Sequence, residues 1–219
     1  MRGKRQKKNA DLSRERVLEV AVSLLDREGL SGFSMRRLGA ELEADPMAVY
    51  YYFPNKGALL DGVLERILAR VVLPEDVRIA WPEQIRMVMR ELRRVLRNHA
   101  HVVPLLIARP LWTPASLQIG DMLARLLLEA GFTEDQAADA ILSLSSYLVG
   151  HLLAEQEPTD RTTISEQEAR AHLMQSAIEK YPAFQHVFTR SQGYSIERRF
   201  ERGLELLLQG LLSQERGRS

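Results

Sequence analysis

Apolar residues recur every three to four positions along most of this chain, and this spacing restricts its fold more than any other feature. In residues 14–29 the pattern marks one face of a helix, formed by Val17, Val20, Ala21, Leu24 and Leu25. Gly29 then ends the pattern. No segment alternates apolar and polar residues as a half-buried strand would. The sequence therefore predicts an all-α protein.

Helix-starting and helix-ending residues divide the remainder of the chain. Thr133–Gln136 and Ser165–Glu168 have the form of capping boxes, in which the side chains at the two ends satisfy backbone N–H groups. Pro182 and Gly193 predict an irregular stretch before the last helix. The longer helices predicted after the first are 56–72, 81–98, 115–130, 134–154, 165–180 and 195–212.

Composition limits the class of protein. The chain contains no cysteine, which excludes disulfides, thiolate metal sites and a cysteine nucleophile. Hydrophobic residues make up 45% and charged residues 27%, as in ordinary globular proteins, and we expect a cytoplasmic protein without a membrane span or signal peptide. Residues 1–11 are basic and predict a flexible arm, either a solvated tail or a segment that contacts phosphate.

Residues 34–56 have the pattern of two short helices joined by a tight turn. Ser34 is a suitable N-cap for the first, and Asp45 with Pro46 begins the second. With the preceding helix they form a three-helix unit whose predicted core is Leu18, Leu25, Leu38, Leu42, Val49 and Phe53. This is the helix-turn-helix arrangement.

The outer side of the second short helix is aromatic. Its Met47 and Tyr50–Tyr52 are too many to be buried in so small a unit, and Arg36, Arg37 and Lys56 flank them. Tyrosines offer apolar contact with sugars and thymine methyls together with a hydroxyl for phosphate oxygen. The pattern indicates a DNA-binding surface, the alternative being an aromatic cluster that belongs to the core.

These motifs resemble a known family. Residues 12–67 are similar to the DNA-binding domain of the TetR family of transcriptional repressors, through Met35–Leu42, Val49–Phe53, Asn55–Lys56 and Leu59–Asp61. Beyond them Ala108–Pro110, Glu129–Phe132 and Glu155–Glu157 resemble the regulatory domain of the tetracycline repressors. The resemblance implies a helix-turn-helix DNA-binding domain at 12–55 and an effector-binding and dimerisation domain at 56–219.

Carried over to this chain, the resemblance implies which residues meet double-stranded operator DNA: Ser34, Met35, Arg36, Arg37, Pro46, Met47, Ala48, Tyr50, Tyr51, Tyr52 and Lys56. Two departures matter. Glu43 occupies the turn position where glycine is usual, so it must adopt a conformation that costs about 1 kcal/mol. The residues 46–48 lack amide side chains, so direct hydrogen bonding to bases is sparse there.

The family also places an effector cavity in the second domain. Residues implied by position to line it are Val72, Met87, Leu105, Arg109, Pro110, Trp112, Leu117, Leu123, Tyr147 and His151, although apolar residues among them could equally be plain core. The histidines that hold the drug–magnesium complex in tetracycline repressors correspond to Leu105 and Val72. None of the five histidines has metal-ligand spacing. We therefore expect no cofactor or metal and a largely apolar effector.

A single short helix covers few base pairs, so DNA reading by this unit calls for a homodimer. Residues 134–154 and 195–212 carry small residues beside broad leucine faces and are the predicted dimer helices, unless they only pack within one chain. We expect a ligand-responsive repressor that leaves a palindromic operator when its effector binds. A constitutive DNA-binding or architectural protein is the alternative, and the absence of nucleophile, phosphate-loop and HExxH motifs argues against an enzyme.

Overall fold

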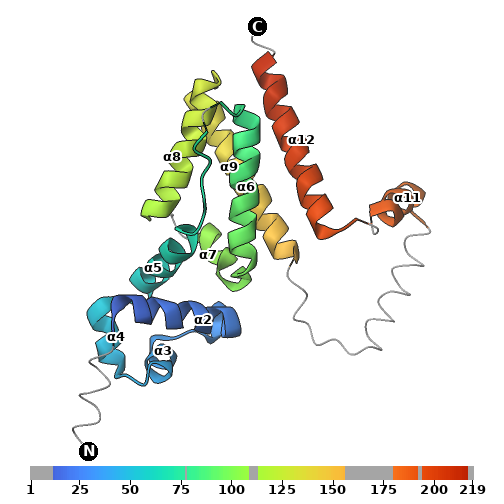
Figure 1. Ribbon diagram of the computed structural model, residues 1–219. Coiled ribbons are helices and arrows are strands. Elements are labelled where there is room, and N and C mark those ends of the chain that lie inside the picture. The colour runs from blue at the N-terminus through green and yellow to red at the C-terminus, as the bar shows by residue number, and fades with distance from the viewer. Residues whose placement is uncertain (1–11, 77, 109–112, 156–179, 192–193, 217–219) are drawn as a thin grey trace, which may run out of the picture.

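A computed structural model describes residues 12–76, 78–108, 113–155, 180–191 and 194–216. Every regular element within them is a helix, as the sequence predicts. Short N-terminal helices form a small head at one end of the molecule, and longer helices form a bundle that stands on it (Figure 1). The predicted arm at 1–11 and the predicted helix at 165–180 fall outside the described residues.

The head consists of α2 (Arg14–Gly32), α3 (Met35–Glu41) and α4 (Pro46–Tyr52). Helix α2 contains the predicted break, because Gly29 has φ 69° and interrupts the helical backbone there. Five of the six predicted core residues are buried and the other is half-buried. Leu42 is the half-buried residue.

The two short helices begin at the predicted caps. The Ser34 hydroxyl accepts a hydrogen bond from the backbone N–H of Arg37 at 3.2 Å. The Asp45 carboxylate accepts one from the backbone N–H of Met47 at 2.9 Å. Each cap satisfies an N–H group that the first helical turn leaves without a partner.

The turn between α3 and α4 depends on two residues. A Cβ at Gly39 would lie 3.2 Å from Cγ of Pro46 and 3.3 Å from the Ala44 carbonyl oxygen, so glycine allows the close approach of the two helices. Glu43 has φ 50°, in the left-handed region predicted for it.

Helix α5 (Lys56–Leu68) closes the core of the head. Its Leu59 and Val63 are buried with the head residues. A Cβ at Gly62 would lie 3.0 Å from side-chain atoms of both Leu18 and Phe53, so even a methyl group there would require these side chains to shift. The first half of α5 is therefore part of the head.

The prediction of one helix over 56–72 is wrong at its C-terminal end. The backbone N–H groups of Arg70 and Val71 bond to the carbonyls of Ile67 and Leu68, at 3.2 Å and 2.9 Å. These bonds span three residues rather than four and tighten the last turn, and Pro74 follows shortly. Val71 still packs against the core, so its place in the apolar pattern reflects burial after the helix has ended.

The bundle contains α6 (Trp81–Arg97), a 3₁₀ turn η1 (Ala100–Val102), α7 (Val103–Ala108), α8 (Pro114–Glu129), α9 (Glu134–Glu155) and α12 (Ile196–Arg216). The Thr133–Gln136 capping box is present, with reciprocal bonds of 3.1 Å and 3.3 Å. Helices α6, α8, α9 and α12 begin within a residue of their predicted starts, although α12 continues past the predicted end at 212.

Residues 182–191 form helix α11 (Pro182–Ser191), where the sequence predicted irregular structure. Proline at the first helical position loses no hydrogen bond, and the backbone N–H of Gln185 bonds to the Tyr181 carbonyl at 3.0 Å. Pro182 therefore starts a helix instead of breaking one. Helix α11 lies beside the lower end of α12, away from the rest of the bundle (Figure 1).

A ladder of ion pairs joins α6 to α12, which lie side by side in Figure 1. Arg86 pairs with Glu205 at 2.5 Å, and Arg90 with Glu201 at 2.7 Å. The next pair along is made by Glu197 with Arg97, at 3.2 Å. The three glutamates follow one another at four-residue intervals, so they share one face of α12.

Among the described helices, α9 alone is long and apolar enough to cross a bilayer by length and composition. Six of its side chains, however, are buried within the bundle: Ala137, Ala140, Leu144, Leu148, Val149 and Leu152. Its apolar composition reflects a helix that packs against α6, α7, α8 and α12.

Replacing Glu43 with glycine should stabilise the protein. The left-handed conformation destabilises a residue with a Cβ by about 1–2 kcal/mol, and glycine removes this strain. The greater conformational freedom of glycine in the unfolded chain offsets part of that gain. We expect Glu43→Gly to raise the free energy of unfolding by about 0.5–1 kcal/mol in urea titrations. Ala40→Gly, at an exposed helical position nearby, should lower it by about 1 kcal/mol. Destabilisation by both substitutions would contradict the assigned strain.

Candidate DNA-binding surface and effector cavity

Helix α4 presents an exposed aromatic face. Tyr51 is 84% exposed and Met47 72% exposed, whereas Val49 on the opposite side is buried. Tyr50 is exposed to a lesser extent. Large apolar side chains held in water on a short, well-capped helix are costly unless they meet a partner.

Two residues predicted at the DNA lie elsewhere. Met35 is buried in the core of the head because it occupies the inner face of α3. Its side chain therefore does not face the DNA as the sequence predicted. Tyr52 is half-buried and its hydroxyl donates to the carbonyl of Leu12. Its ring meets that of Tyr51 edge to face, with centroids 5.2 Å apart. Tyr52 therefore supports Tyr51 instead of projecting beside it.

The three predicted cations differ in their surroundings. Arg36 is exposed on α3. Arg37 forms an ion pair with Glu28 of α2 at 2.7 Å. Lys56 donates from Nζ to the Phe33 carbonyl at 2.9 Å. Ser34 serves as the cap of α3, while Pro46 and Ala48 in the first turn of α4 are half-buried.

An apolar cavity of about 200 Å³ lies among α5, α6, α7, α8 and α9. Its lining consists of Leu68, Met89, Leu92, Leu96, Leu106, Ser116, Ile119, Gly120, Leu123, Ile141, Ser145, Leu148 and Val149. A concave, mostly apolar site with two hydroxyl groups suits a small organic molecule.

Of the predicted effector residues that the structure describes, Leu123 alone lines this cavity. Leu105 is buried, and Val72, Met87 and Leu117 are exposed. Arg109, Pro110 and Trp112 lie outside the described residues. Val72 instead borders an open groove of about 630 Å³ between residues 71–75 and α8, because the chain has left α5 before reaching it.

Tyr147 and His151 belong to a different place, which corrects their assignment to the cavity. They lie on the side of α9 that faces α12, where the Tyr147 hydroxyl donates to the Phe200 carbonyl at 2.7 Å. A Cβ at Gly203 would lie 2.7 Å from the Tyr147 ring, so only glycine fits under it. The Tyr147 and His151 rings stack with centroids 5.9 Å apart.

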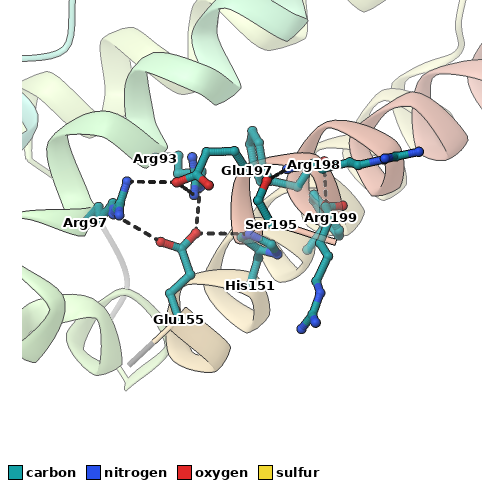
Figure 2. A network of polar contacts seen from close by, with 10 residues as sticks. Arg93, Arg97, His151, Glu155, Ser195, Glu197, Arg198 and Arg199 are labelled. Atoms are coloured by element: carbon teal, nitrogen blue, oxygen red, sulfur yellow. Dashed lines mark hydrogen bonds and ion pairs between the residues drawn. The ribbon is translucent and has the colours of Figure 1, made fainter. Parts of the chain in front are cut away.

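His151 is part of a polar network that joins three helices (Figure 2). Glu155 of α9, only 7% exposed, lies 3.0 Å from His151 Nε2 and 2.6 Å from Nε of Arg93 on α6. Glu197 of α12 lies 3.7 Å from the same Arg93. The network therefore ties the C-terminal end of α9 to α6 and α12.

The pKa of His151 lies below its ordinary value. Burial is the largest cause, and the positive charge of Arg93 lowers the pKa further. Glu155 acts in the opposite direction but does not offset these two effects. His151 is therefore neutral near pH 7, and its contact with Glu155 is not a full ion pair.

The sequence missed most of the cavity-lining residues. Met89, Leu92 and Leu96 belong to the apolar stripe of α6, and in the sequence they resemble any other core residue. Gly120 was the one available signal, because a glycine inside a helix is unfavourable. A Cβ there would meet no atom within 4 Å. In the described part of the chain, no group of three or more histidine or acidic side chains could hold a metal ion.

An exposed helix-turn-helix joined to a helical bundle with an apolar cavity is the architecture of a ligand-responsive transcriptional regulator. Two family profiles match the chain. Residues 17–63 match the profile described as bacterial regulatory proteins of the tetR family, and residues 73–214 match the tetracyclin repressor-like C-terminal domain.

Individual relatives agree. An HTH-type transcriptional repressor of Streptomyces coeruleorubidus is 30% identical over 95% of this chain and 81% of its own length. The structure of the TetR family protein ActR of Streptomyces coelicolor in complex with actinorhodin has a TM-score of 0.79 at 28% identity, covering 93% of this chain and 98% of that one. BioQ with its double-stranded DNA operator has a TM-score of 0.66 at 26% identity, covering 93% and 99%.

The chain belongs to the TetR family. As the sequence predicted, it is a ligand-responsive DNA-binding transcriptional regulator and not an enzyme, because these relatives are regulators. Regulators of this family bind operator DNA and small-molecule effectors.

Acid should destabilise the protein partly through His151. Its folded-state pKa is lowered, so as pH falls below about 6.5 the unfolded chain takes up a proton that the folded chain does not, and stability is lost until the folded pKa is reached. We expect the free energy of unfolding to fall less between about pH 7.5 and pH 5.5 in His151→Gln than in the wild type. An equal fall in both proteins would contradict the lowered pKa.

Proposed function

We propose that this protein is a dimeric repressor that binds a palindromic operator and leaves it when a small molecule fills the cavity. The observation that carries the proposal is the course of α5. Its first half completes the core of the head, and its last residue, Leu68, lines the cavity. A molecule in the cavity thus touches the same helix that carries the DNA-binding head.

The proposal assigns DNA binding to residues 12–55, with Tyr51, Met47 and Tyr50 of α4 in the major groove and Arg36 at a base edge or phosphate. Ser34, Pro46 and Ala48 lie beside these residues at the DNA, Arg37 and Lys56 contact the flanking DNA backbone, and Tyr52 supports Tyr51 from within the head. The exposure of Tyr51 and Met47 supports this assignment, as does the structure of BioQ with its operator. Residues 1–11 would add phosphate contacts, and the cytoplasm would be the site of action.

Residues 56–219 would bind the effector and form the dimer. The effector would be largely apolar and free of metal, because eleven of the thirteen cavity-lining residues lack polar side chains. The complex of ActR with actinorhodin supports an organic effector. Arg109 and Trp112 remain candidates at the cavity by their position in the sequence.

Helices α9 and α12 would pair with their copies in the second chain. Leu206 of α12 is 75% exposed and Leu142 of α9 is 65% exposed. A shallow groove between the two helices includes Ser143, Leu206 and Gly210. Exposed leucines beside small residues are suited to close helix packing in a four-helix bundle. This would place the two heads one helical turn of DNA apart, about 34–36 Å.

A constitutive DNA-binding protein would have no use for the cavity, which makes the cavity the feature to test. Gly120→Leu should add a side chain to the wall of the cavity, since Gly120 lines it and a Cβ there would meet no atom within 4 Å. A thermal-shift screen of small apolar molecules against the wild type supplies the ligand. We expect Gly120→Leu to abolish its stabilising shift and its release of operator, while Gly120→Ala retains both. Failure of every stabilising molecule to release operator would favour the constitutive alternative.

The DNA-binding surface makes a separate prediction. Tyr51→Ala and Arg36→Ala should each weaken binding to operator selected from random duplex DNA by about 1–3 kcal/mol, with unchanged unfolding. Tyr181→Ala, at an exposed tyrosine outside the head, is the control and should bind normally. Fluorescence anisotropy at two salt concentrations measures both affinity and its electrostatic part. Wild-type affinity in both head variants would remove α4 from the interface.

A further inference from the structure

A buried polar contact joins the head to the bundle at the end of α6. His99, which follows α6, is 8% exposed and is one of three polar residues buried in the described part of the chain. Its ring lies between Asp26 of α2 and Arg70, just beyond α5. The adjoining turn η1 packs against α2, where a Cβ at Gly29 would lie 3.5 Å from the His101 ring.

The two contacts of the imidazole indicate which nitrogen of the neutral ring carries the hydrogen. The Arg70 guanidinium lies 3.1 Å from His99 Nε2, and an arginine N–H can only donate, so Nε2 accepts. The proton of the neutral ring is then on Nδ1, which donates to the Asp26 carboxylate at 2.8 Å. One ring thus bridges an anion of the head and a cation at the end of α5, with each nitrogen in a different role.

Two residues of the bridge are close in sequence to residues that line the cavity. Leu96, which lines the cavity, precedes His99 by one helical turn, and its carbonyl accepts the backbone N–H of His99 at 2.9 Å. Leu68, which also lines the cavity, is two residues from Arg70. Asp26, by contrast, belongs to α2 in the head.

We propose that His99 is a positioning residue that fixes the orientation of the head on the bundle by bridging Asp26 and Arg70. This proposal rests on the proposed function, since the oriented head is the one that binds operator. The chain passes from the head to the bundle through α5, and without a lateral contact the head could turn about the axis of that helix. Together with the packing of η1 against α2, the bridge attaches the C-terminal half of α2 to the bundle at the end of α5.

The orientation of the head is directly measurable in the full chain. The protein has no cysteine, so Ser23→Cys on α2 and Arg125→Cys on α8, both exposed, give a pair of unique spin-label sites. Dilution with unlabelled chains leaves one labelled chain per dimer. We expect a narrow distance distribution in the otherwise unaltered chain. His99→Phe, which keeps a ring but removes both nitrogens, should broaden or shift it.

The matched variant His99→Gln retains an N–H donor and an oxygen acceptor and should restore the narrow distribution. An unchanged distribution in His99→Phe overturns the proposal. A distribution as broad in His99→Gln as in His99→Phe overturns it too, because loss of packing would then explain the effect.

Operator binding gives a second readout. His99→Phe and Asp26→Ala should each weaken binding about tenfold, and the double variant should bind no more weakly than either alone, because both remove the same bridge. Fully additive losses overturn the proposal. If the unaltered chain binds no operator, the proposed function fails, whereas the distance measurement still decides whether His99 orients the head.

Discussion

The close contact of α5 with the head is the constraint on which the rest of the structure depends. Gly62 allows α5 to approach Leu18 and Phe53 so closely that the head has no complete core without it. A three-helix unit of this size buries too little apolar surface to be stable alone, and the added helix supplies it. The consequence is mechanical. The first half of α5 shares its core with the head, so a rigid shift of α5 at its Leu68 end would carry the head with it.

Helix α6 contacts the cavity with one face and α12 with another, and different residue types occupy the two faces. Met89, Leu92 and Leu96 face the cavity, whereas Arg86, Arg90 and Arg97 face the glutamates of α12. Since exposed ion pairs contribute little free energy, the buried Phe200, Leu204 and Leu208 supply most of the attachment of α12, and the charges mainly orient it. The helix that lines the cavity is thus also the helix on which α12 rests.

Local sequence signals predicted where most of the helices begin, although they missed α11, and they predicted less well what each side chain contacts. Caps such as Ser34, Asp45 and Thr133 act within four residues, so they can be recognised without the fold, and the strained Glu43 followed from the turn pattern alone. The end of α5 and the placement of Tyr147 and His151 could not be predicted in this way. Apolar periodicity shows that Val71 is sheltered but not that the helix has ended, and a residue on α9 can face either the cavity or α12. That choice depends on how α12 returns to the bundle, which is a contact between residues some fifty positions apart.

The even spacing of the ladder has a further consequence for α12. Glutamates at 197, 201 and 205 repeat every four residues, so sliding the helix by four residues, about 6 Å, would set Arg86 opposite Glu201 and Arg90 opposite Glu197. The charges alone thus specify a series of nearly equivalent registers. The contact of Tyr147 with Gly203 is available in only one of them, because any other residue brought beneath that ring would collide with it. A single glycine therefore selects the register of the helix that carries Leu206.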